Sequence, residues 1–272
     1  MKTVLLAGGF GTRLSEYTED IPKPMVPVGG LPMLWHIMSI YSHFGHDEFL
    51  LALGYKADYV KSFFVNYETL HSDFILDMAT GKSRAVERPD VNWKLGLIDT
   101  GLNTMTGGRI KRLSSWLMDE TFMATYGDGV SDVDIDALLE FHKSHGKLVT
   151  MTLARPAARF GIVEFEENGL VRSFQEKPLE SAAYVNAGFF VMEPGFLEFI
   201  DGDDAILERD PLERAVAEGE VMAYVHNGFW RPMDTKRDVD DLNRMWDRDE
   251  APWKLWSLES SSARKSRGHF DV

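Results

Sequence analysis

The 272-residue chain has no cysteine, no long apolar run and a deficit of positive charge. Without cysteine it cannot form a disulfide, a zinc–thiolate site or a thiol nucleophile. Its apolar start, residues 4–7, is too short for a signal peptide or a membrane span, and no other stretch approaches membrane length. We therefore expect a cytoplasmic protein without a membrane partner.

Acidic side chains outnumber basic ones, with 43 Asp and Glu against 29 Lys and Arg and a formal net charge of −14. A field of that sign opposes binding to nucleic acid and to anionic membranes. If the substrates are anions, the chain needs a local cluster of arginine, lysine or metal to hold them. Hydrophobic residues make up 44% of the chain, which is ample for one large globular core.

Apolar runs alternate with stretches of helical periodicity along much of the chain. Strands are expected at residues 4–7, 49–53, 122–125, 148–153 and 185–192, with another ending near Asp99, and helices at residues 32–44, 57–65, 135–145 and 237–246. This alternation predicts an α/β fold with a mostly parallel sheet and helices on both faces. After about Phe160, the turn Glu167-Asn168-Gly169 between two short runs predicts a hairpin, which adds antiparallel strands.

A glycine-rich loop, Gly8-Gly9-Phe10-Gly11-Thr12-Arg13, follows the first expected strand. Ligands of open α/β sheets bind at the carboxyl ends of strands. Glycines there allow positive φ and close backbone approach, so that N–H groups converge on phosphate oxygens. Thr12 adds a hydroxyl donor and Arg13 a bidentate guanidinium. By itself, such a loop is also compatible with an ordinary strand-to-helix turn.

Two other phosphate-binding motifs do not fit this loop. A dinucleotide fingerprint needs glycine where Leu14 stands and an acidic residue about twenty positions on, where the chain has Gly29-Gly30. A P-loop needs Gly-Lys-Ser or Gly-Lys-Thr, and Gly11-Thr12-Arg13 does not supply it.

The continuation of the loop is more specific. Prolines on both sides restrict the backbone around Lys23, so its charge can be directed at one phosphate. The full stretch reads Pro22-Lys23-Pro24-Met25-Val26-Pro27-Val28-Gly29-Gly30. Together with the loop, it resembles the signature of the sugar nucleotidyltransferases, and the similarity runs from about Met1 to Trp256. The resemblance implies a Rossmann-like nucleotidyltransferase sheet with a small antiparallel sugar-binding lobe.

The resemblance also implies a division of the chain. We expect one domain over residues 1–256, with a nucleotide-binding half to about residue 155 and a sugar-binding and C-terminal part after it. The Ser-rich stretch 257–272 is expected to be a mobile tail. Arg13 and Lys23 are the expected catalytic residues. The expected nucleotide-binding residues are Leu6, Ala7, Gly8, Gly9, Phe10, Gly11, Thr12, Arg13, Lys23, Thr104, Arg109 and Gly127.

Two aspartates are the expected ligands of Mg²⁺, the implied cofactor. Asp128 follows an apolar run in Tyr126-Gly127-Asp128-Gly129, and Mg²⁺ binds one or two carboxylates together with phosphate oxygens and waters. Asp234 precedes the last expected helix, where residue type and place alone favour an N-cap. The resemblance favours a second metal ligand at Asp234 instead.

Three short motifs resemble the sugar-phosphate site of the same family. They are Arg159-Phe160-Gly161, Glu176-Lys177-Pro178 and Asn186-Ala187-Gly188. The resemblance implies that Glu176 binds sugar hydroxyls and Lys177 neutralises the sugar phosphate. Arg159, Gly161, Asn186 and Gly188 are expected to complete that site. Taken one at a time, each motif is equally compatible with a hairpin that carries a surface ion pair.

Residues 99–109 are expected to determine which nucleobase the protein selects. They read Asp99-Thr100-Gly101-Leu102-Asn103-Thr104-Met105-Thr106-Gly107-Gly108-Arg109 and resemble the same segment of the glucose-1-phosphate cytidylyltransferases. Thr104 and Arg109 are expected to meet cytosine and the triphosphate. The alternative is a glycine-rich surface loop with a solvated arginine.

The implied reaction is transfer of a cytidylyl group from CTP to α-D-glucose 1-phosphate, which gives CDP-glucose and pyrophosphate by direct in-line attack. The same chemistry with dTTP or UTP is the nearest alternative. A non-catalytic, nucleotide-sensing homologue is another, although such proteins typically lose one of four residues that are all present here: Arg13, Lys23, Asp128 and Asp234. The resemblance also implies a homo-oligomer, with a hexamer expected, that serves the synthesis of bacterial surface polysaccharides such as lipopolysaccharide O-antigen.

Overall fold

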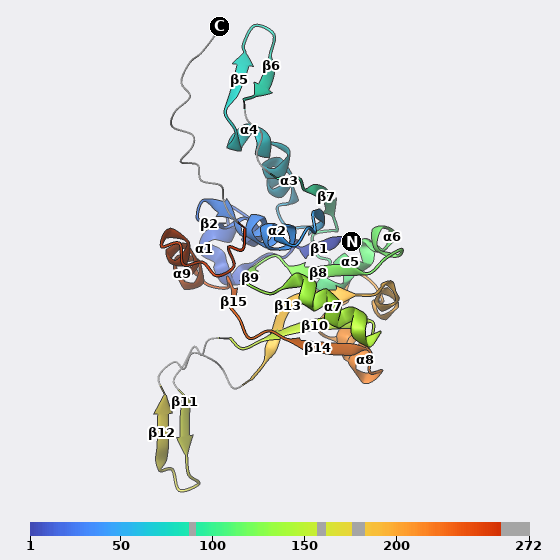
Figure 1. Cartoon of the computed structure of the whole chain (residues 1–272), viewed down its shortest axis with the longest axis vertical. Helices are drawn as coiled ribbons and strands as arrows, with labels where there is room; N and C mark the ends of the chain where they lie inside the picture. The colour runs from blue at the N-terminus through green and yellow to red at the C-terminus, as the bar shows by residue number, and fades with distance from the viewer. Residues whose placement is uncertain (87–90, 157–161, 176–182, 257–272) are drawn as a thin grey trace.

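The computed structural model describes residues 1–86, 91–156, 162–175 and 183–256. Within them, a central sheet has seven strands in the order β14-β10-β13-β8-β1-β4-β7 (Figure 1). Each neighbouring pair is parallel except the two made by β13, which runs antiparallel to β10 and β8. The prediction of a mostly parallel sheet is confirmed. The strands are β1 (Thr3–Leu6), β4 (Glu48–Leu53), β7 (Lys94–Asp99), β8 (Phe122–Tyr126), β10 (Val149–Ala154), β13 (Val185–Met192) and β14 (Val221–Val225).

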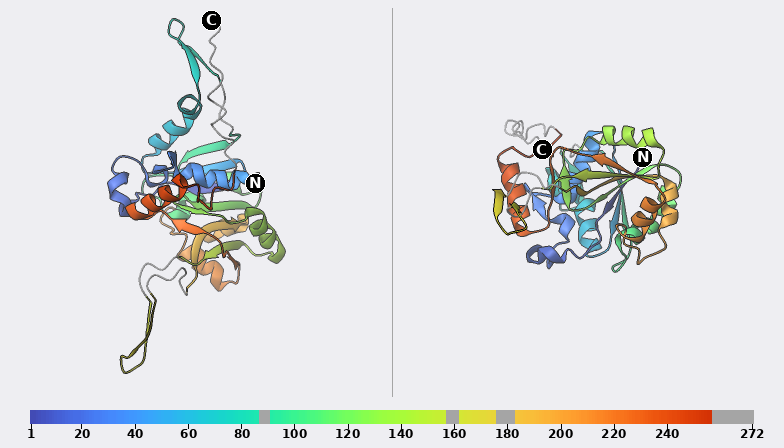
Figure 2. Two further views of the ribbon diagram at one scale, coloured as in Figure 1. Left: turned by 60° about the vertical axis from the view of Figure 1, so that its left-hand side comes forward. Right: turned by 90° about the horizontal axis from the view of Figure 1, so that it is seen from below.

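Successive residues of β1 point to opposite faces of the sheet, and both faces are buried. Leu5 belongs to one hydrophobic core, whereas Val4 and Leu6 belong to a second core on the other side. A strand buried on both faces accounts for the unbroken apolar run, and Figure 2 shows helices on both sides of the sheet. Helices on the first side are α2 (Met33–His43), α3 (Ala57–Val65), α7 (Ile135–His145) and α9 (Lys236–Asp247); on the second are α5 (Thr106–Arg112), α6 (Ser114–Leu117), α8 (Asp210–Ala217) and the 3₁₀ helix η3 (Pro194–Phe199).

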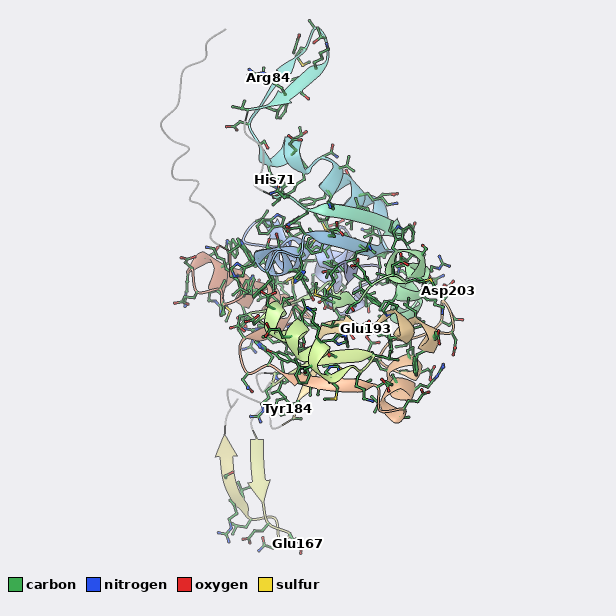
Figure 3. The ribbon with its side chains drawn as sticks, turned by 45° about the vertical axis from the view of Figure 1, so that its right-hand side comes forward. His71, Arg84, Glu167, Tyr184, Glu193 and Asp203 are labelled. Carbon is green, nitrogen blue, oxygen red and sulfur yellow. The ribbon has the colours of Figure 1, made fainter. Side chains whose placement is uncertain are left out.

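Short antiparallel pairs lie outside the central sheet. They are β2–β3 (Pro27–Val28, Leu31–Pro32), β5–β6 (Phe74–Asp77, Lys82–Ala85), β9–β15 (Gly129–Ser131, Trp230–Pro232) and β11–β12 (Ile162–Phe165, Val171–Gln175). The β5–β6 and β11–β12 hairpins project from opposite ends of the body (Figure 1), and Arg84 and Glu167 mark them in Figure 3. The predicted hairpin turn is confirmed in β11–β12, where Gly169 has φ +86°. The remaining helical segments are η1 (Thr12–Leu14), α1 (Ser15–Thr18), η2 (Lys23–Met25) and α4 (Tyr67–His71).

Residues 106–112 form the helix α5, so the alternative of a glycine-rich surface loop is wrong for them. Gly107 and Gly108 lower helix propensity. However, a Cβ on them would lie 2.8 Å from the carbonyl oxygen of Ala205 and 2.4 Å from that of Asp203. Close backbone packing therefore selects glycine inside this helix. The expected tail, residues 257–272, lies outside the described residues, and no helix within them is long and apolar enough to cross a bilayer.

Candidate active site

The glycine loop leaves β1 at its carboxyl end, between β4 and β8. The Ala7 N–H donates to the Ala52 carbonyl at 3.1 Å, and the Gly127 N–H donates to the Leu6 carbonyl at 3.1 Å. Gly11 has φ +64°, and a Cβ there would lie 2.7 Å from Cβ of Lys23. Glycine at this position allows both the left-handed backbone and the close approach to Lys23.

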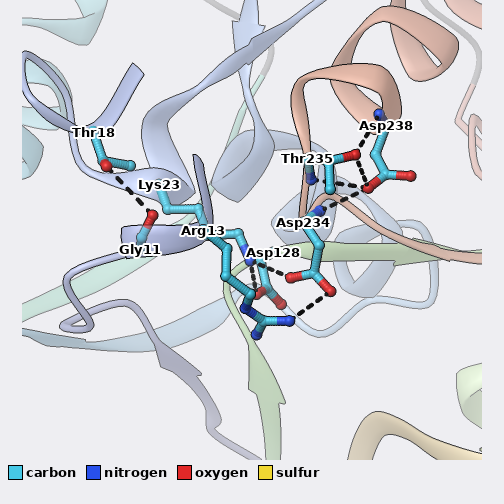
Figure 4. A network of polar contacts seen from close by, with 8 residues as sticks. All are labelled: Gly11, Arg13, Thr18, Lys23, Asp128, Asp234, Thr235 and Asp238. Atoms are coloured by element: carbon cyan, nitrogen blue, oxygen red, sulfur yellow. Dashed lines mark hydrogen bonds and ion pairs between the residues drawn. The ribbon is translucent and has the colours of Figure 1, made fainter. Parts of the chain in front are cut away.

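Lys23 lies between two aspartates that are far apart in the sequence (Figure 4). Its Nζ is 2.5 Å from Oδ2 of Asp128 and 2.9 Å from Oδ1 of Asp234. Arg13 contacts the other oxygen of Asp234, with Nη1 and Oδ2 3.0 Å apart. The Lys23 side chain is 9% exposed and that of Arg13 is 75% exposed. One buried cation and one solvent-facing cation thus share a pair of carboxylates.

The two aspartates keep Lys23 charged. Burial disfavours the ammonium, but the charges and hydrogen bonds of Asp128 and Asp234 outweigh it and raise the pKa of Lys23 above its ordinary value of 10.5. Lys23 is therefore a cation at neutral pH. The local positive cluster that anionic substrates require in a chain of net charge −14 begins with this residue and Arg13.

The same pair of carboxylates fits a divalent cation. Asp128 and Asp234 already direct one oxygen each at a single cationic atom, Nζ of Lys23. A hard ion such as Mg²⁺ takes one or two carboxylates and completes its shell with phosphate oxygens and water. No group of three or more Asp, Glu or His side chains is arranged to hold a metal in the described part of the chain. This donor set suits an ion that depends on phosphate oxygens from a ligand.

Asp234 is not the N-cap of the helix that follows it. The N-cap of α9 is Thr235, whose hydroxyl accepts from the Asp238 N–H while the Asp238 carboxylate accepts from the Thr235 N–H. This capping box satisfies the first turn of α9. The Asp234 carboxylate is therefore available for Lys23 and Arg13, as Figure 4 shows, and the cap interpretation is wrong.

A cavity of about 490 Å³ opens beside these charges. Its walls come from the glycine loop, from residues 102–106 and from the end of β8. Each residue expected to bind the nucleotide lines the cavity, apart from Ala7. The cavity lies at the carboxyl ends of β1 and β8, where open α/β sheets bind their ligands. The lining residues are Leu6, Gly8, Gly9, Phe10, Gly11, Thr12, Arg13, Lys23, Pro24, Leu102, Asn103, Thr104, Met105, Thr106, Arg109, Tyr126, Gly127 and Asp128.

Arg109 lines this cavity but is only 4% exposed, so the alternative of a solvated surface arginine is wrong. Burial lowers the pKa of its guanidinium below the ordinary value. A Cβ on Gly8 would lie 2.1 Å from Nη1 of Arg109, so glycine at position 8 leaves room for the guanidinium. Its acceptors, at 2.8 to 3.3 Å, are the carbonyls of Gly8, Leu53, Gly101 and Leu102 and the Thr100 hydroxyl. Arg109 thus joins the glycine loop to the segment that precedes α5.

The sugar-side residues are described only in part. Asn186 and Gly188 lie on β13, and the Asn186 side chain donates from Nδ2 to the Tyr126 hydroxyl at 3.1 Å. Gly188 has φ +81°, and a Cβ there would lie 2.3 Å from Cδ2 of Tyr126. Asn186 is thereby placed next to the end of β8. Arg159, Gly161, Glu176 and Lys177 lie outside the described residues.

A family model for nucleotidyl transferases matches residues 2–247. This chain belongs to the nucleotidyl transferase family. Among its relatives, glucose-1-phosphate cytidylyltransferase of Salmonella typhi is 48% identical over 257 residues, which cover 94% of this chain and 100% of the relative. The probable glucose-1-phosphate cytidylyltransferase of Bacillus subtilis is 39% identical with the same coverage. The crystal structure of HddC from Yersinia pseudotuberculosis is similar with a TM-score of 0.67 and 25% identity, and covers 90% of this chain and 99% of that one.

In this nucleotidyl transferase, residues singled out from the sequence lie together although they come from distant segments. Arg13, Lys23, Asp128 and Asp234 form one network of ion pairs. Their roles toward substrates and metal stay predictions. Sequence reasoning did not assign a role to Tyr126, although it directly precedes Gly127-Asp128 in the motif. It also missed Glu208, which belongs to no recognised motif.

Proposed function

We propose that this nucleotidyl transferase moves a cytidylyl group from CTP to α-D-glucose 1-phosphate and releases pyrophosphate and CDP-glucose. The observation that carries the proposal is similarity along the entire length of a glucose-1-phosphate cytidylyltransferase, at 48% identity, and of a probable one, at 39% identity. The cations that line the cavity, Arg13 and Lys23, support it, because a nucleoside triphosphate brings several negative charges to one place.

The glycine loop, Arg13 and Lys23 would bind the triphosphate. Backbone N–H groups of residues 8–12 are the donors that such a loop offers to phosphate oxygens. Arg13 extends into solvent and can form a bidentate contact with an incoming phosphate. Lys23 starts a 3₁₀ helix between two prolines, so it presents its charge from a restricted backbone.

Asp128 and Asp234 would hold Mg²⁺, which neutralises phosphate charge and orients the transferred group when bound. Lys23 is the residue that neutralises both carboxylates in this structure. Its ammonium would therefore hold the two carboxylates in place at the nucleotide end of the cavity.

The reaction needs no protein nucleophile. An oxygen of glucose 1-phosphate forms the new bond to the α-phosphorus of CTP. The bond from that phosphorus to the bridging oxygen breaks, and pyrophosphate leaves with the electron pair. Side chains contribute by positioning the reactants and by stabilising charge on the phosphates. We propose that Arg13 and Lys23 do so for the nucleotide, and that Lys177 does so for the sugar phosphate.

The sugar phosphate would bind at the end of β13 that carries Asn186. Asn186 supports this proposal, because its amide is fixed at the end of β8 beside the cavity. Glu176 is proposed to bind sugar hydroxyls. Arg159, Gly161 and Gly188 are proposed to complete the sugar-phosphate site.

A nucleotide panel tests the proposal. Purified protein with glucose 1-phosphate and Mg²⁺ is offered CTP, dTTP, UTP, GTP or ATP, and pyrophosphate release is followed while mass spectrometry identifies the sugar nucleotide. We expect turnover with CTP to exceed the others. Preference for dTTP or UTP would replace the base assignment but keep the reaction. If none of the five nucleotides gives pyrophosphate release, the result would favour the non-catalytic alternative.

We also propose that the chain is a cytoplasmic homo-oligomer, with a hexamer as the expected assembly. Exposed apolar side chains on the projecting β5–β6 hairpin support an oligomer: Phe74, Ile75 and Leu76 are 43–47% exposed and Met78 is 83% exposed. Apolar surface of this kind is typical of protein–protein contacts. Light scattering coupled to size-exclusion chromatography measures the assembly, and a monomer at micromolar concentration would contradict it.

A further inference from the structure

Glu208, an exposed residue just before α8, bonds to two different walls of the cavity. Its Oε1 accepts a hydrogen bond from the Tyr126 hydroxyl, and its Oε2 accepts one from the Thr106 hydroxyl at 3.0 Å. Tyr126 ends β8, whereas Thr106 starts α5. Both residues line the cavity. One carboxylate therefore joins the end of a central strand to the segment expected to meet the nucleobase.

The Tyr126 contact continues to the sugar side. The same hydroxyl accepts from Nδ2 of Asn186 at 3.1 Å, and Oδ1 of Asn186 accepts from the Gly188 N–H at 2.8 Å. Both ends of the Asn186 amide are thus held. The Tyr126 hydroxyl thus donates to Glu208 and accepts from Asn186, which links the carboxylate to the amide.

The Thr106 contact belongs to a second set of bonds. The Thr106 hydroxyl accepts from the Leu207 N–H at 2.8 Å, next to Glu208 in the chain. The Met105 N–H donates to the Asp203 carbonyl at 2.8 Å. The segment 203–208 therefore holds the start of α5 and with it the cavity-lining residues 102–106.

We propose that Glu208 is a positioning residue for both substrates, through Tyr126 and Asn186 for the sugar phosphate and through Thr106 for the nucleotide. The proposal rests on the proposed function. Glu208 is an exposed residue, and its carboxylate orients the two hydroxyl groups that donate to it. Removing it leaves the hydroxyl of the partly buried Tyr126 without this acceptor.

The test is a set of double-mutant cycles. Glu208→Ala should raise the KM for glucose 1-phosphate about tenfold and the KM for CTP severalfold, which is the effect of losing one orienting hydrogen bond on each side. In a Tyr126→Phe background, Glu208→Ala should leave the KM for glucose 1-phosphate unchanged and still raise that for CTP. In a Thr106→Val background the pattern should reverse. Such selective non-additivity is not expected from a general loss of structure.

Two further variants complete the experiment. Glu208→Gln should keep both KM values close to those of the parent, because an amide keeps one acceptor for Tyr126 and can donate to Thr106. Glu213→Ala, an exposed glutamate on α8, is the matched control and should leave both KM values as in the parent. Additive effects of Glu208→Ala in both backgrounds, or an effect no larger than that of Glu213→Ala, would overturn the proposal.

Failure of the proposed function gives a different result. If the parent protein uses another nucleotide, the base assignment fails and the same cycles are run with that nucleotide. If the parent protein turns over no nucleotide, calorimetry gives Kd values for CTP and glucose 1-phosphate. The double-mutant cycles are then calculated from these Kd values instead of KM values. A parent that binds neither substrate would overturn both proposals.

Discussion

Replacing Arg109 by alanine should destabilise the free protein and weaken nucleotide binding together. The guanidinium is 4% exposed and donates to five acceptors, four of them backbone carbonyls. Because these carbonyls belong to the glycine loop, the end of β4 and residues 101–102, the change removes the contact that holds three cavity-forming segments together.

The size of the loss follows from the acceptors left behind. The Gly8 carbonyl keeps the Tyr55 N–H as a donor at 3.0 Å, and the Leu53 carbonyl keeps the Thr100 N–H at 2.9 Å, so neither becomes an isolated buried acceptor. The Gly101 and Leu102 carbonyls lose a charged donor. A hydrogen bond to a charged group makes a net contribution of about 1.5 to 3 kcal/mol to the free energy of unfolding, and such contributions are not additive. We expect the free energy of unfolding to fall by about 3 to 5 kcal/mol, because two such bonds lose their donor without a replacement.

Urea unfolding followed by tryptophan fluorescence measures this loss. Arg112→Ala is the matched control, because Arg112 lies on the same helix but is exposed and forms an ion pair with an exposed aspartate, Asp203. That variant should unfold close to the parent. If Arg109→Ala is as stable as Arg112→Ala, the guanidinium does not hold these segments, and the reasoning is refuted.

Kinetics provide the second half of the test. The segments that Arg109 holds line the nucleotide cavity, so Arg109→Ala should raise the KM for CTP more than the KM for glucose 1-phosphate. Equal changes in the two KM values would contradict a role on the nucleotide side, whatever the stability of the variant.

Three other predictions address the charges and the pH response. Lys23→Ala should lower turnover by about 10² or more, as loss of a charge contact in the transition state does, and an unchanged kcat would exclude Lys23 from the mechanism. Asp128→Asn should weaken the response to Mg²⁺, which parallel titrations of activity measure; identical curves for variant and parent would refute it. Burial lowers the pKa of His36 from 6.5 to about 4, so between these values acid protonates the unfolded chain but not the folded one. The free energy of unfolding should therefore fall on acidification by up to about 3 kcal/mol, and urea titrations at pH 7 and pH 5 should show a smaller fall for His36→Gln than for the parent.

The local sequence pattern was enough to predict much of the fold and those residues of the candidate site that lie in recognisable motifs. The periodicities of residues 57–65 and 135–145 predicted α3 and α7 with the bounds that the structure has. The glycine loop, Lys23 between prolines and Asp128 after a strand were recognisable because each depends on neighbours in the chain. These features indicate a nucleotidyl transferase without knowledge of what lies opposite them.

Only the tertiary structure decided what depends on partners far along the chain. Asp234 could be an N-cap by its place in the sequence, and its contact with Lys23, 211 residues away, assigns it to the site. Arg109 could be a surface side chain, and packing against the carbonyls of three segments makes it a buried connection. Glu208 stands in no motif, yet it contacts Tyr126 and Thr106. Charge and hydrogen-bond partners act over a few ångströms in space, and only the folded chain shows which residues lie that close.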